Sequence, residues 1–247
     1  MKVGFMFSTK DRVEFTLQSL KGIDAEGGFD LIWIDGSKTQ KGKELLGQIE
    51  LHNCHLAEIH HDIVGGSTKA IILGLNRLLS LGYDYCGIIE NDIGFKQGWF
   101  PKLMELFDMG DRDRLEVGAA TIRTIASRVL TYKPDYAVMY NVGAGMVLFT
   151  AKAAKIILDN IYYSIEKGFK INAQLLKEFY KKKYGVDLTT VYEIWMEKPN
   201  RSLGYDWAYA MELDKCNLVS LGSIPFMAYN LDCNMAKYRT CYVGGVE

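Results

Sequence analysis

The chain has 247 residues, of which 49% are hydrophobic and only four are proline, and its formal net charge at pH 7 is −1. This composition is typical of a folded globular protein and excludes a largely disordered chain. The near-zero net charge argues against nucleic acid held by bulk electrostatics.

The sequence gives no sign of export or of a membrane span. The apolar run at residues 3–7 is too short for a signal peptide, and no stretch approaches the ~20 apolar residues of a transmembrane helix. The five cysteines are odd in number and no two have CxxC spacing, which favours reduced thiols over disulfides or a zinc site. We therefore expect a cytoplasmic protein without a transmembrane segment.

The first half of the chain alternates short apolar runs with segments of helical periodicity. The pattern predicts strands at 3–7, 29–35, 56–63 and 86–92, and helices at 11–23, 42–52, 65–84 and 98–108. This order indicates a mainly parallel sheet that is covered on both faces. Ligands of such sheets bind beyond the carboxyl ends of the strands, so the polar residues there should converge on one crevice. These residues are Ser8 to Asp11, Asp35 to Ser37, His61 and Asp62, and Glu90 to Asp92.

The second half is less regular. Strands are predicted at 115–123 and at 137–150, the latter broken by Gly143 and Gly145. Helices are predicted at 151–168, 171–185 and 205–215, followed by strand-like segments at 218–222 and 225–230. No internal repeat or clean linker divides the chain, so we expect a single domain over residues 1–247.

Two acids flank Asn91 at the end of the fourth strand. Glu90 and Asp92 occupy alternate positions and point the same way if the strand remains extended. Carboxylates at a strand end suit Mg²⁺ or Mn²⁺, which commonly bridges a carboxylate to a diphosphate. The alternative is that residues 91–94 form only an Asx-type turn. The sequence alone leaves both interpretations open.

Six short motifs, taken in their order and spacing, resemble the family 2 glycosyltransferases, which have the GT-A fold. The family has a strand with a polar segment before Arg, an Asp-Gly-Ser-like turn, a Gly-rich segment before a helix, an Asp-x-Asp motif, a small-residue strand and an acidic pair at a helix start. The matching segments are FMFSTKDRVEFTLQSL, LIWIDGSKT, VGGSTKAIILGLNRLL, GIIENDIGFKQGWFPKLMELF, VGAGMVLFTAKAAKII and GYDWAYAMEL. The resemblance spans residues 2–230, except that 109–140 and 160–200 match nothing.

The resemblance implies an α/β fold of the GT-A type, with three α/β/α layers around a mainly parallel mixed sheet. Residues 1–108 would form the nucleotide-sugar-binding half, and 109–247 an acceptor-side half with helical elaboration. The implied activity is that of a hexosyltransferase-like enzyme, inverting and metal-assisted. Its donor would be a nucleotide-diphosphate sugar, with a UDP-sugar favoured, and its acceptor an unidentified glycan, lipid or other hydroxyl compound.

The resemblance also implies roles for individual residues. Mn²⁺ or Mg²⁺ would be held by Asp92 and Glu90. Asp11 would line the base and ribose pocket, although it can also cap the following helix, and Asp35 would accept a hydrogen bond from the base or ribose. Lys69 would reach a phosphate, although a solvated helix lysine is an equal alternative. The complete implied donor-binding set is Ser8, Thr9, Asp11, Asp35, Lys69, Asn76, Glu90, Asn91, Gly143, Ala144 and Gly145.

Asp206 is the implied catalytic base. An inverting transferase needs a carboxylate that takes a proton from the acceptor hydroxyl. The alternative is that Asp206 only favours the positive end of the helix dipole. Aromatic and basic residues of the second half would shape the acceptor site, although core packing explains most aromatic residues. They are Tyr192, Trp195, Arg201 and Trp207.

Two departures from the family pattern weaken the metal assignment. The first position of the acidic motif is the longer Glu90, and the family's late histidine is absent, with only Asn230 and Asp232 near its place. These departures fit one alternative, a non-catalytic module that binds a sugar nucleotide or glycan, or a partner of another transferase. A nucleotidyltransferase is a second alternative, disfavoured because no Gly-rich segment with Arg or Lys follows the first strand.

Overall fold

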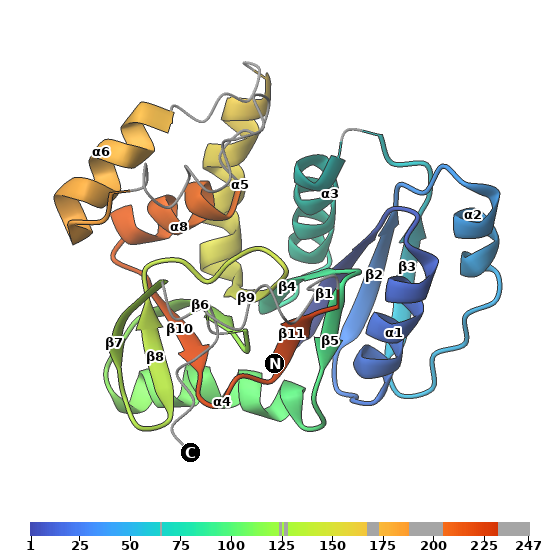
Figure 1. Ribbon diagram of the computed structural model, residues 1–247, viewed down its shortest axis with the longest axis horizontal. Helices are drawn as coiled ribbons and strands as arrows, with labels where there is room; N and C mark the ends of the chain where they lie inside the picture. The colour runs from blue at the N-terminus through green and yellow to red at the C-terminus, as the bar shows by residue number, and fades with distance from the viewer. Residues whose placement is uncertain (65, 124, 126–127, 167–172, 188–204, 232–247) are drawn as a thin grey trace.

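The computed structural model describes residues 1–64, 66–123, 125, 128–166, 173–187 and 205–231. Within these residues, a nine-stranded sheet runs through the molecule and helices lie on both of its faces (Figure 1). The strand order is β3-β2-β1-β4-β9-β6-β10-β8-β7. The strands are β1 Val3–Thr9, β2 Asp30–Asp35, β3 His55–His60, β4 Tyr85–Glu90, β6 Val117–Thr121, β7 Val129–Tyr132, β8 Tyr136–Met139, β9 Met146–Thr150 and β10 Val219–Ser223.

The first four strands of the sheet are parallel neighbours, as the alternation of strand and helix predicts. In the rest of the described sheet, β9 is antiparallel to its neighbours β4 and β6, and β8 is antiparallel to its neighbours β10 and β7. Since β6 and β10 are parallel, all strands other than β8 and β9 point in one direction. The predicted α/β class with a mainly parallel mixed sheet is therefore confirmed.

Helices cover the two faces of the sheet with separate apolar clusters. One cluster joins α3, α5 and α8 to the sheet through residues such as Leu75, Ile157 and Leu213. The other joins α1 and α4 through residues such as Ile23 and Leu103. Burial on both sides explains why the central strands read as continuous apolar runs. The helices are α1 Val13–Asp24, α2 Gln40–Leu46, α3 Gly66–Ser80, α4 Trp99–Arg112, α5 Ala151–Glu166, α6 Ala173–Tyr184 and α8 Tyr205–Lys215.

A glycine sets the distance between α3 and the sheet. A Cβ built at Gly74 would lie 2.4 Å from the Cβ of Met6 in β1, which is too close for any side chain. The absence of a side chain therefore lets α3 pack directly on β1. This contact brings the first turn of α3 to the carboxyl end of the central strands.

Several predicted boundaries are wrong. The predicted helix at 42–52 ends at Leu46 as α2, where the chain enters a turn with Gly47 as the C-terminal cap. The predicted strand at 86–92 ends at Glu90, because residues 91–92 form a turn. The predicted strand at 137–150 is two strands, β8 and β9, that lie apart in the sheet. Strand β7 was not predicted.

A second, two-stranded sheet lies beside the main one. It pairs β5 Ile93–Phe95 with β11 Ala228–Asn230 in antiparallel register. The backbone N of Leu231 donates to Asp92 O at 2.7 Å. The last described residues therefore close over the turn that follows β4. Among the residues described, none of the helices has the length and apolar character needed to cross a membrane.

Candidate functional site

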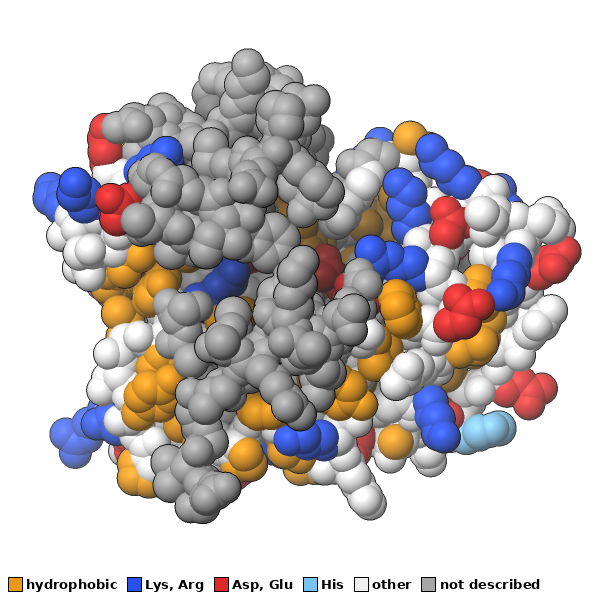
Figure 2. Space-filling view, viewed as in Figure 1, with side chains coloured by type: hydrophobic (Ala, Val, Ile, Leu, Met, Phe, Trp, Pro, Cys, Tyr) orange, Lys and Arg blue, Asp and Glu red, His pale blue; other side chains and the backbone are white. Residues whose placement is uncertain are grey.

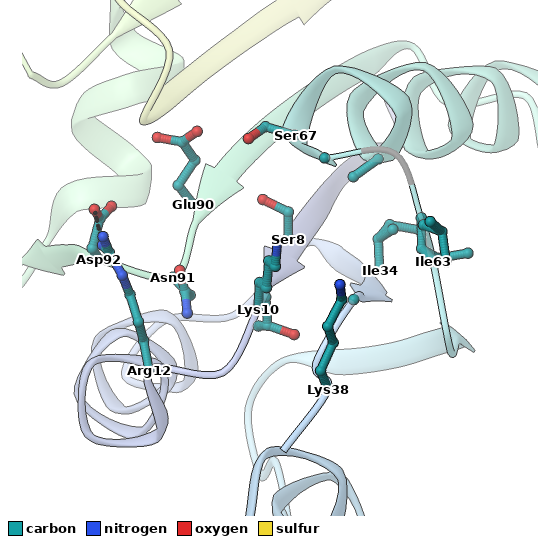
Figure 3. A pocket seen from close by; sticks show the side chains of 15 residues that line it. Ser8, Lys10, Arg12, Ile34, Lys38, Ile63, Ser67, Glu90, Asn91 and Asp92 are labelled. Atoms are coloured by element: carbon teal, nitrogen blue, oxygen red, sulfur yellow. Dashed lines mark hydrogen bonds and ion pairs between the residues drawn. The ribbon is translucent and has the colours of Figure 1, made fainter. Parts of the chain in front are cut away.

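A cavity of about 400 Å³ opens at the carboxyl ends of β1, β2 and β4 and at the first turn of α3 (Figure 3). In the close-up, the Glu90 carboxylate and the Lys38 ammonium point toward the cavity from different sides. The structure therefore brings the ends of three predicted strands together, as parallel topology requires. The lining residues are Ser8, Thr9, Lys10, Arg12, Ile34, Gly36, Lys38, Ile63, Val64, Gly66, Ser67, Ala70, Glu90, Asn91 and Asp92.

Asp35 links the carboxyl ends of β1 and β2 behind the cavity. Its carboxylate is 2% exposed, and Oδ1 accepts hydrogen bonds from Thr9 Oγ1 at 2.8 Å, from Ser37 Oγ at 2.7 Å and from Ser37 N at 3.1 Å. Trp33 Nε1 in turn donates to Thr9 Oγ1 at 2.7 Å. Asp35 lies behind the cavity and not on its surface, so its described contacts stabilise the two strand ends.

Asp11 holds the neighbouring loop in place. Its Oδ1 accepts hydrogen bonds from Lys38 N at 3.0 Å, Thr39 N at 2.8 Å and Thr39 Oγ1 at 2.7 Å. These bonds, chiefly that from the Thr39 backbone, lower the pKa of Asp11. The expectation that Asp11 caps its own helix is wrong, because α1 has Arg12 at its N-cap position and no side-chain cap. Asp11 instead binds the segment that begins α2.

The turn after β4 separates the two acids of the predicted metal motif. Glu90 is the last residue of β4, and Asn91 is buried with its amide donating to Thr16 Oγ1 at 2.9 Å. Asp92 Oδ2 forms an ion pair with Arg12 Nη1 at 3.1 Å, and Figure 3 shows these two side chains directed at each other. The chain thus turns at residues 91–92 and continues directly into β5, and no Asx-type bond from Asn91 to the local backbone is among the described contacts; both carboxylates still line the cavity.

Glu90 lies in a strongly polar but poorly solvated position. Burial raises the pKa of Glu90, and the charges of Asp92 and Asp206 raise it further. The Tyr205 hydroxyl, which donates to Oε1 at 2.5 Å, and the charge of Arg123 both lower the pKa of Glu90. Since burial outweighs these partners, an additional cation near Glu90 would stabilise its ionised form.

Asp206 lies in the first turn of α8, where it forms a partly buried ion pair. Arg128 Nη1 donates to Asp206 Oδ2 at 2.8 Å, and the two side chains are 21% and 11% exposed. The same nitrogen donates to Asn141 Oδ1 at 2.6 Å, which also accepts from Gly143 N at 2.7 Å. No hydrogen bond from a described residue reaches Asp206 Oδ1. One carboxylate oxygen is therefore held by Arg128, and Asp206 itself is buried and is not among the residues that line the cavity.

The predicted acceptor-side aromatic residues are described only in part. Trp207 is 3% exposed and packs against the rings of Tyr140 and Tyr180, with Arg128 over its face at 5.0 Å. These contacts give Trp207 a role in the core and in supporting Arg128. The other predicted acceptor residues, Tyr192, Trp195 and Arg201, lie outside the described residues, as does Asp232.

The remaining predicted residues lie outside the cavity lining. Lys69 and Asn76 are exposed on α3. Gly143 and Gly145 are buried in the segment before β9, with Ala144 half-buried between them. A Cβ at Gly145 would meet Arg123 Nη1 at 2.8 Å and Ile93 Cδ1 at 2.7 Å. The space beside Gly145 is thus filled by protein side chains.

The structure adds several residues that the sequence did not assign. Lys10, Arg12 and Lys38 supply positive charge to the cavity. On the face shown in Figure 2, Lys and Arg side chains gather between α2 and α3. Lys10 and Arg12 lie within the first motif and could have been found there. Arg123 and Arg128 lie in the segment without a matching motif, and no sequence signal identified them.

Two carboxylates at the cavity are available to a divalent cation. Asp92 Oδ1 and Glu90 Oε2 accept no hydrogen bond from a described residue. Two carboxylates of this kind fit Mg²⁺ or Mn²⁺, which often takes one or two protein carboxylates and completes its shell with phosphate and water. No group of three or more His, Cys, Asp or Glu residues suited to a metal exists within the described ranges. The site therefore fits a cation that a ligand helps to hold.

Comparisons with known proteins give distant structural likeness only. No protein-family model and no curated protein matches this chain. The chain is similar to the crystal structure of S. aureus TarS at 11% identity and a TM-score of 0.45, over 64% of this chain and 30% of TarS. The chain is also similar to the crystal structure of S. aureus TarS 1–349, at 11% identity and a TM-score of 0.42, over 65% of this chain and 49% of that one.

A third solved structure is similar over most of both chains. Mouse xyloside xylosyltransferase 1 in its apo form is 11% identical with a TM-score of 0.46, over 98% of this chain and 93% of the other. The matched regions span less than half of either TarS chain. All three TM-scores lie below 0.5, so no residue role is transferred from these proteins.

Proposed function

We propose that this protein is a glycosyltransferase that moves a sugar from a nucleotide-diphosphate sugar to an acceptor hydroxyl. The main observation behind the proposal is the polar cavity at the ends of β1, β2 and β4, which is lined by both carboxylate and basic side chains. Open α/β sheets bind their ligands at this edge. The ordered series of six sequence motifs supports the same activity.

The cavity suits a nucleotide diphosphate. Lys10, Arg12 and Lys38 would offset the charge of the diphosphate, and the loops held by Asp11 and Asp35 would face the nucleoside. Arg and Lys are the usual phosphate partners in proteins. A UDP-sugar is the favoured donor, and the acceptor is a glycan, a lipid or another compound with a hydroxyl group.

Asp206 would act as the base of an inverting reaction. Its Oδ1 would take the proton of the acceptor hydroxyl while that oxygen forms a bond to the anomeric carbon and the bond to the diphosphate breaks. Arg128 would keep the carboxylate oriented through Oδ2. Mn²⁺ or Mg²⁺ would be held by Asp92 and Glu90, and when bound it would stabilise the charge on the leaving diphosphate.

One observation favours a second candidate, a non-catalytic module that binds a sugar nucleotide. The Asp206 carboxylate is already paired with Arg128, and Glu90 already accepts a hydrogen bond from Tyr205. A protein that only binds its ligand needs neither carboxylate for chemistry. The two candidates differ in whether the donor is cleaved.

A panel of nucleotide sugars tests the proposal, because a ligand that binds the folded state raises the melting temperature according to its affinity. The stabilising donor is then incubated with acceptor mixtures and Mn²⁺, and release of nucleoside diphosphate is measured. Acceptor-dependent release supports a transferase, and binding without release supports the second candidate. If no nucleotide sugar raises the melting temperature, both are wrong.

An Asp92→Asn variant tests the proposed metal site separately. We expect it to weaken Mn²⁺-dependent binding of the nucleoside diphosphate while leaving metal-free binding nearly unchanged. Because Arg12 pairs with Asp92 and also lines the cavity, Arg12→Gln should weaken binding of the nucleoside diphosphate both with and without Mn²⁺, which distinguishes loss of a positive charge from loss of a metal ligand. Equal Mn²⁺-dependent affinity in the wild type and in Asp92→Asn would remove Asp92 from the metal site.

A further inference from the structure

Arg123 follows β6 and is held at the junction of three strand ends. Its backbone N donates to Thr121 Oγ1 at 3.1 Å, and that hydroxyl donates to Met146 O at 2.6 Å. Thr121 is fully buried at the end of β6, and Met146 begins β9. The backbone at Arg123 is therefore fixed against the strand that pairs with β4.

The Arg123 side chain lies over Gly145, and Gly145 is hydrogen-bonded to Glu90 in the cavity wall. A Cβ at Gly145 would lie 2.8 Å from Arg123 Nη1, so the guanidinium uses the space that the missing side chain leaves. The carbonyl oxygen of Gly145 accepts a hydrogen bond from Glu90 N at 2.9 Å, and Glu90 lines the cavity. The guanidinium is thus positioned beside the acidic end of β4.

Within the described part of the chain, the Arg123 guanidinium has no hydrogen-bond or ion-pair partner, although its charge acts on the Glu90 carboxylate. Its Nε is buried without a hydrogen bond, and no described carboxylate forms an ion pair with it. Arg128 differs, because Asp206 and Asn141 both engage it. The terminal nitrogens of the Arg123 guanidinium donate no hydrogen bond to a described residue either, and an anionic ligand oxygen would give them an acceptor.

We propose that Arg123 is a binding residue for the diphosphate of the donor. This inference rests on the proposed function, since it names a further residue of the same site. A guanidinium presents several donors in a planar fork that matches phosphate oxygens, and its charge does not depend on pH in the physiological range. Arg123 then approaches the phosphates beside Glu90, while Arg12 approaches them beside Asp92.

Calorimetric titration with UDP, GDP, uridine, guanosine and pyrophosphate tests this role. The proteins are the wild type, Arg123→Gln, Arg123→Lys and Arg112→Gln, the last being an exposed control on α4. We expect Arg123→Gln to weaken binding of the nucleoside diphosphate by about 10- to 100-fold, the range for a hydrogen bond to a charged group. Nucleoside affinity should stay constant, and Arg123→Lys should retain part of the diphosphate affinity.

A Gly145→Ala variant tests the same role without removing the arginine. The three atoms nearest to the added methyl group would be Ile93 Cδ1, Ile93 Cγ1 and Arg123 Nη1, all in side chains, so we expect the chain to fold while the guanidinium shifts. We expect weaker binding of the nucleoside diphosphate, and no additional loss when Arg123→Gln is also present. If Gly145→Ala and Arg123→Gln each bind it within twofold of wild type, the inference is overturned.

The titrations also separate this inference from the proposed function. Nucleoside-diphosphate binding that survives in Arg123→Gln overturns the role of Arg123 and leaves the proposed function standing. If the wild type binds pyrophosphate but neither nucleotide, and Arg123→Gln abolishes that binding, the anion site stands and the proposed function does not. A wild type that binds none of the probes overturns both.

Discussion

Tyr205 donates its hydroxyl hydrogen to Glu90 Oε1 at 2.5 Å, although 115 positions separate the two residues in the chain. Tyr205 begins α8, and Glu90 ends β4. The bond therefore joins the start of a C-terminal helix to the strand end that lines the cavity. Asp206, the next residue of α8, comes close enough for its charge to act on Glu90.

A Tyr205→Phe variant should be less stable than wild type. It removes a hydroxyl that donates to a poorly solvated carboxylate, which is worth about 1.5–3 kcal/mol in the free energy of unfolding. Urea denaturation measures the loss, with Tyr132→Phe as an exposed control. When Glu90 is replaced by Gln, the loss of unfolding free energy caused by Tyr205→Phe should become smaller. An equal loss with Glu90 and with Gln at position 90 would show that the hydroxyl does not act through Glu90.

A Glu90→Gln variant should be more stable than wild type at neutral pH. The folded pKa of Glu90 is raised above its ordinary value of 4.5, chiefly by burial, so the folded state binds the proton more tightly than the unfolded state. Ionisation then disfavours the fold, and its stability falls as pH rises from about 4.5 through the folded pKa.

The gain from Glu90→Gln should therefore grow as the pH rises above about 4.5. Urea denaturation in the presence of a chelator measures it, because a bound cation would stabilise the ionised form. Glu44→Gln, at an exposed position on α2, is the matched control. A pH-independent difference between wild type and Glu90→Gln would contradict the raised pKa.

An Asp206→Asn variant should lose both activity and stability. If Asp206 is the base, turnover should fall by about 10²–10⁴ while donor affinity stays nearly constant. A helix-start role alone would cost less than ~1 kcal/mol, because asparagine caps nearly as well as aspartate. The ion pair with Arg128 raises this expectation to about 3 kcal/mol, since the substitution leaves a poorly solvated guanidinium without its counter-charge.

The double variant Arg128→Met/Asp206→Asn separates the two losses. Removing both charges should recover part of the stability without restoring turnover. Melting temperature and steady-state kinetics measure the two properties independently. Near-normal turnover in a folded Asp206→Asn protein would exclude Asp206 as the base.

An Asp35→Ala variant should destabilise the fold more than an ordinary surface substitution. It leaves the donors of Thr9 and Ser37 without their acceptor, at a cost of about 2–4 kcal/mol. Asp35→Asn keeps an oxygen at this position and should lose less. Thermal unfolding compares these variants with Asp111→Ala, an exposed control that should change stability by less than ~0.5 kcal/mol. Equal melting temperatures for Asp35→Ala and the control would contradict the buried role of Asp35.

The same variants test the predicted nucleoside contact. If Asp35 acts only through the two strand ends, Asp35→Asn should bind the nucleoside within twofold of wild type. A larger loss in a stable Asp35→Asn protein would support the direct contact implied by the sequence motif.

Local periodicity predicted most of the first half of the fold. Apolar runs in β1, β2 and β4 and the helical spacing of α3 are short-range patterns, and parallel topology then places Ser8 and Glu90 at one edge. The hydrogen-bonded ends of β1 and β2 follow from the same topology. These features needed no knowledge of distant contacts.

The second half of the site depends on contacts that no local pattern encodes. Arg128 and Asp206 are 78 residues apart, and Arg128 lies in a segment without a matching motif. The segment 137–150 reads as one apolar strand, yet β10 and β6 lie between its two parts in the sheet. Strand β7 has only four residues, VLTY, and is mostly exposed, so no alternation of apolar and polar residues marks it in the sequence.

The position of β10 between β6 and β8 has a consequence for the order of folding during synthesis. In the sheet, the β7–β8 pair reaches β6 only through β10, which is the last of the nine strands to be made. A nascent chain halted at residue 200 therefore holds the parallel strands β3-β2-β1-β4 but has no sheet neighbour for the β7–β8 pair. Limited proteolysis of such ribosome-bound chains should cut first at residues 129–139 and spare residues 3–90.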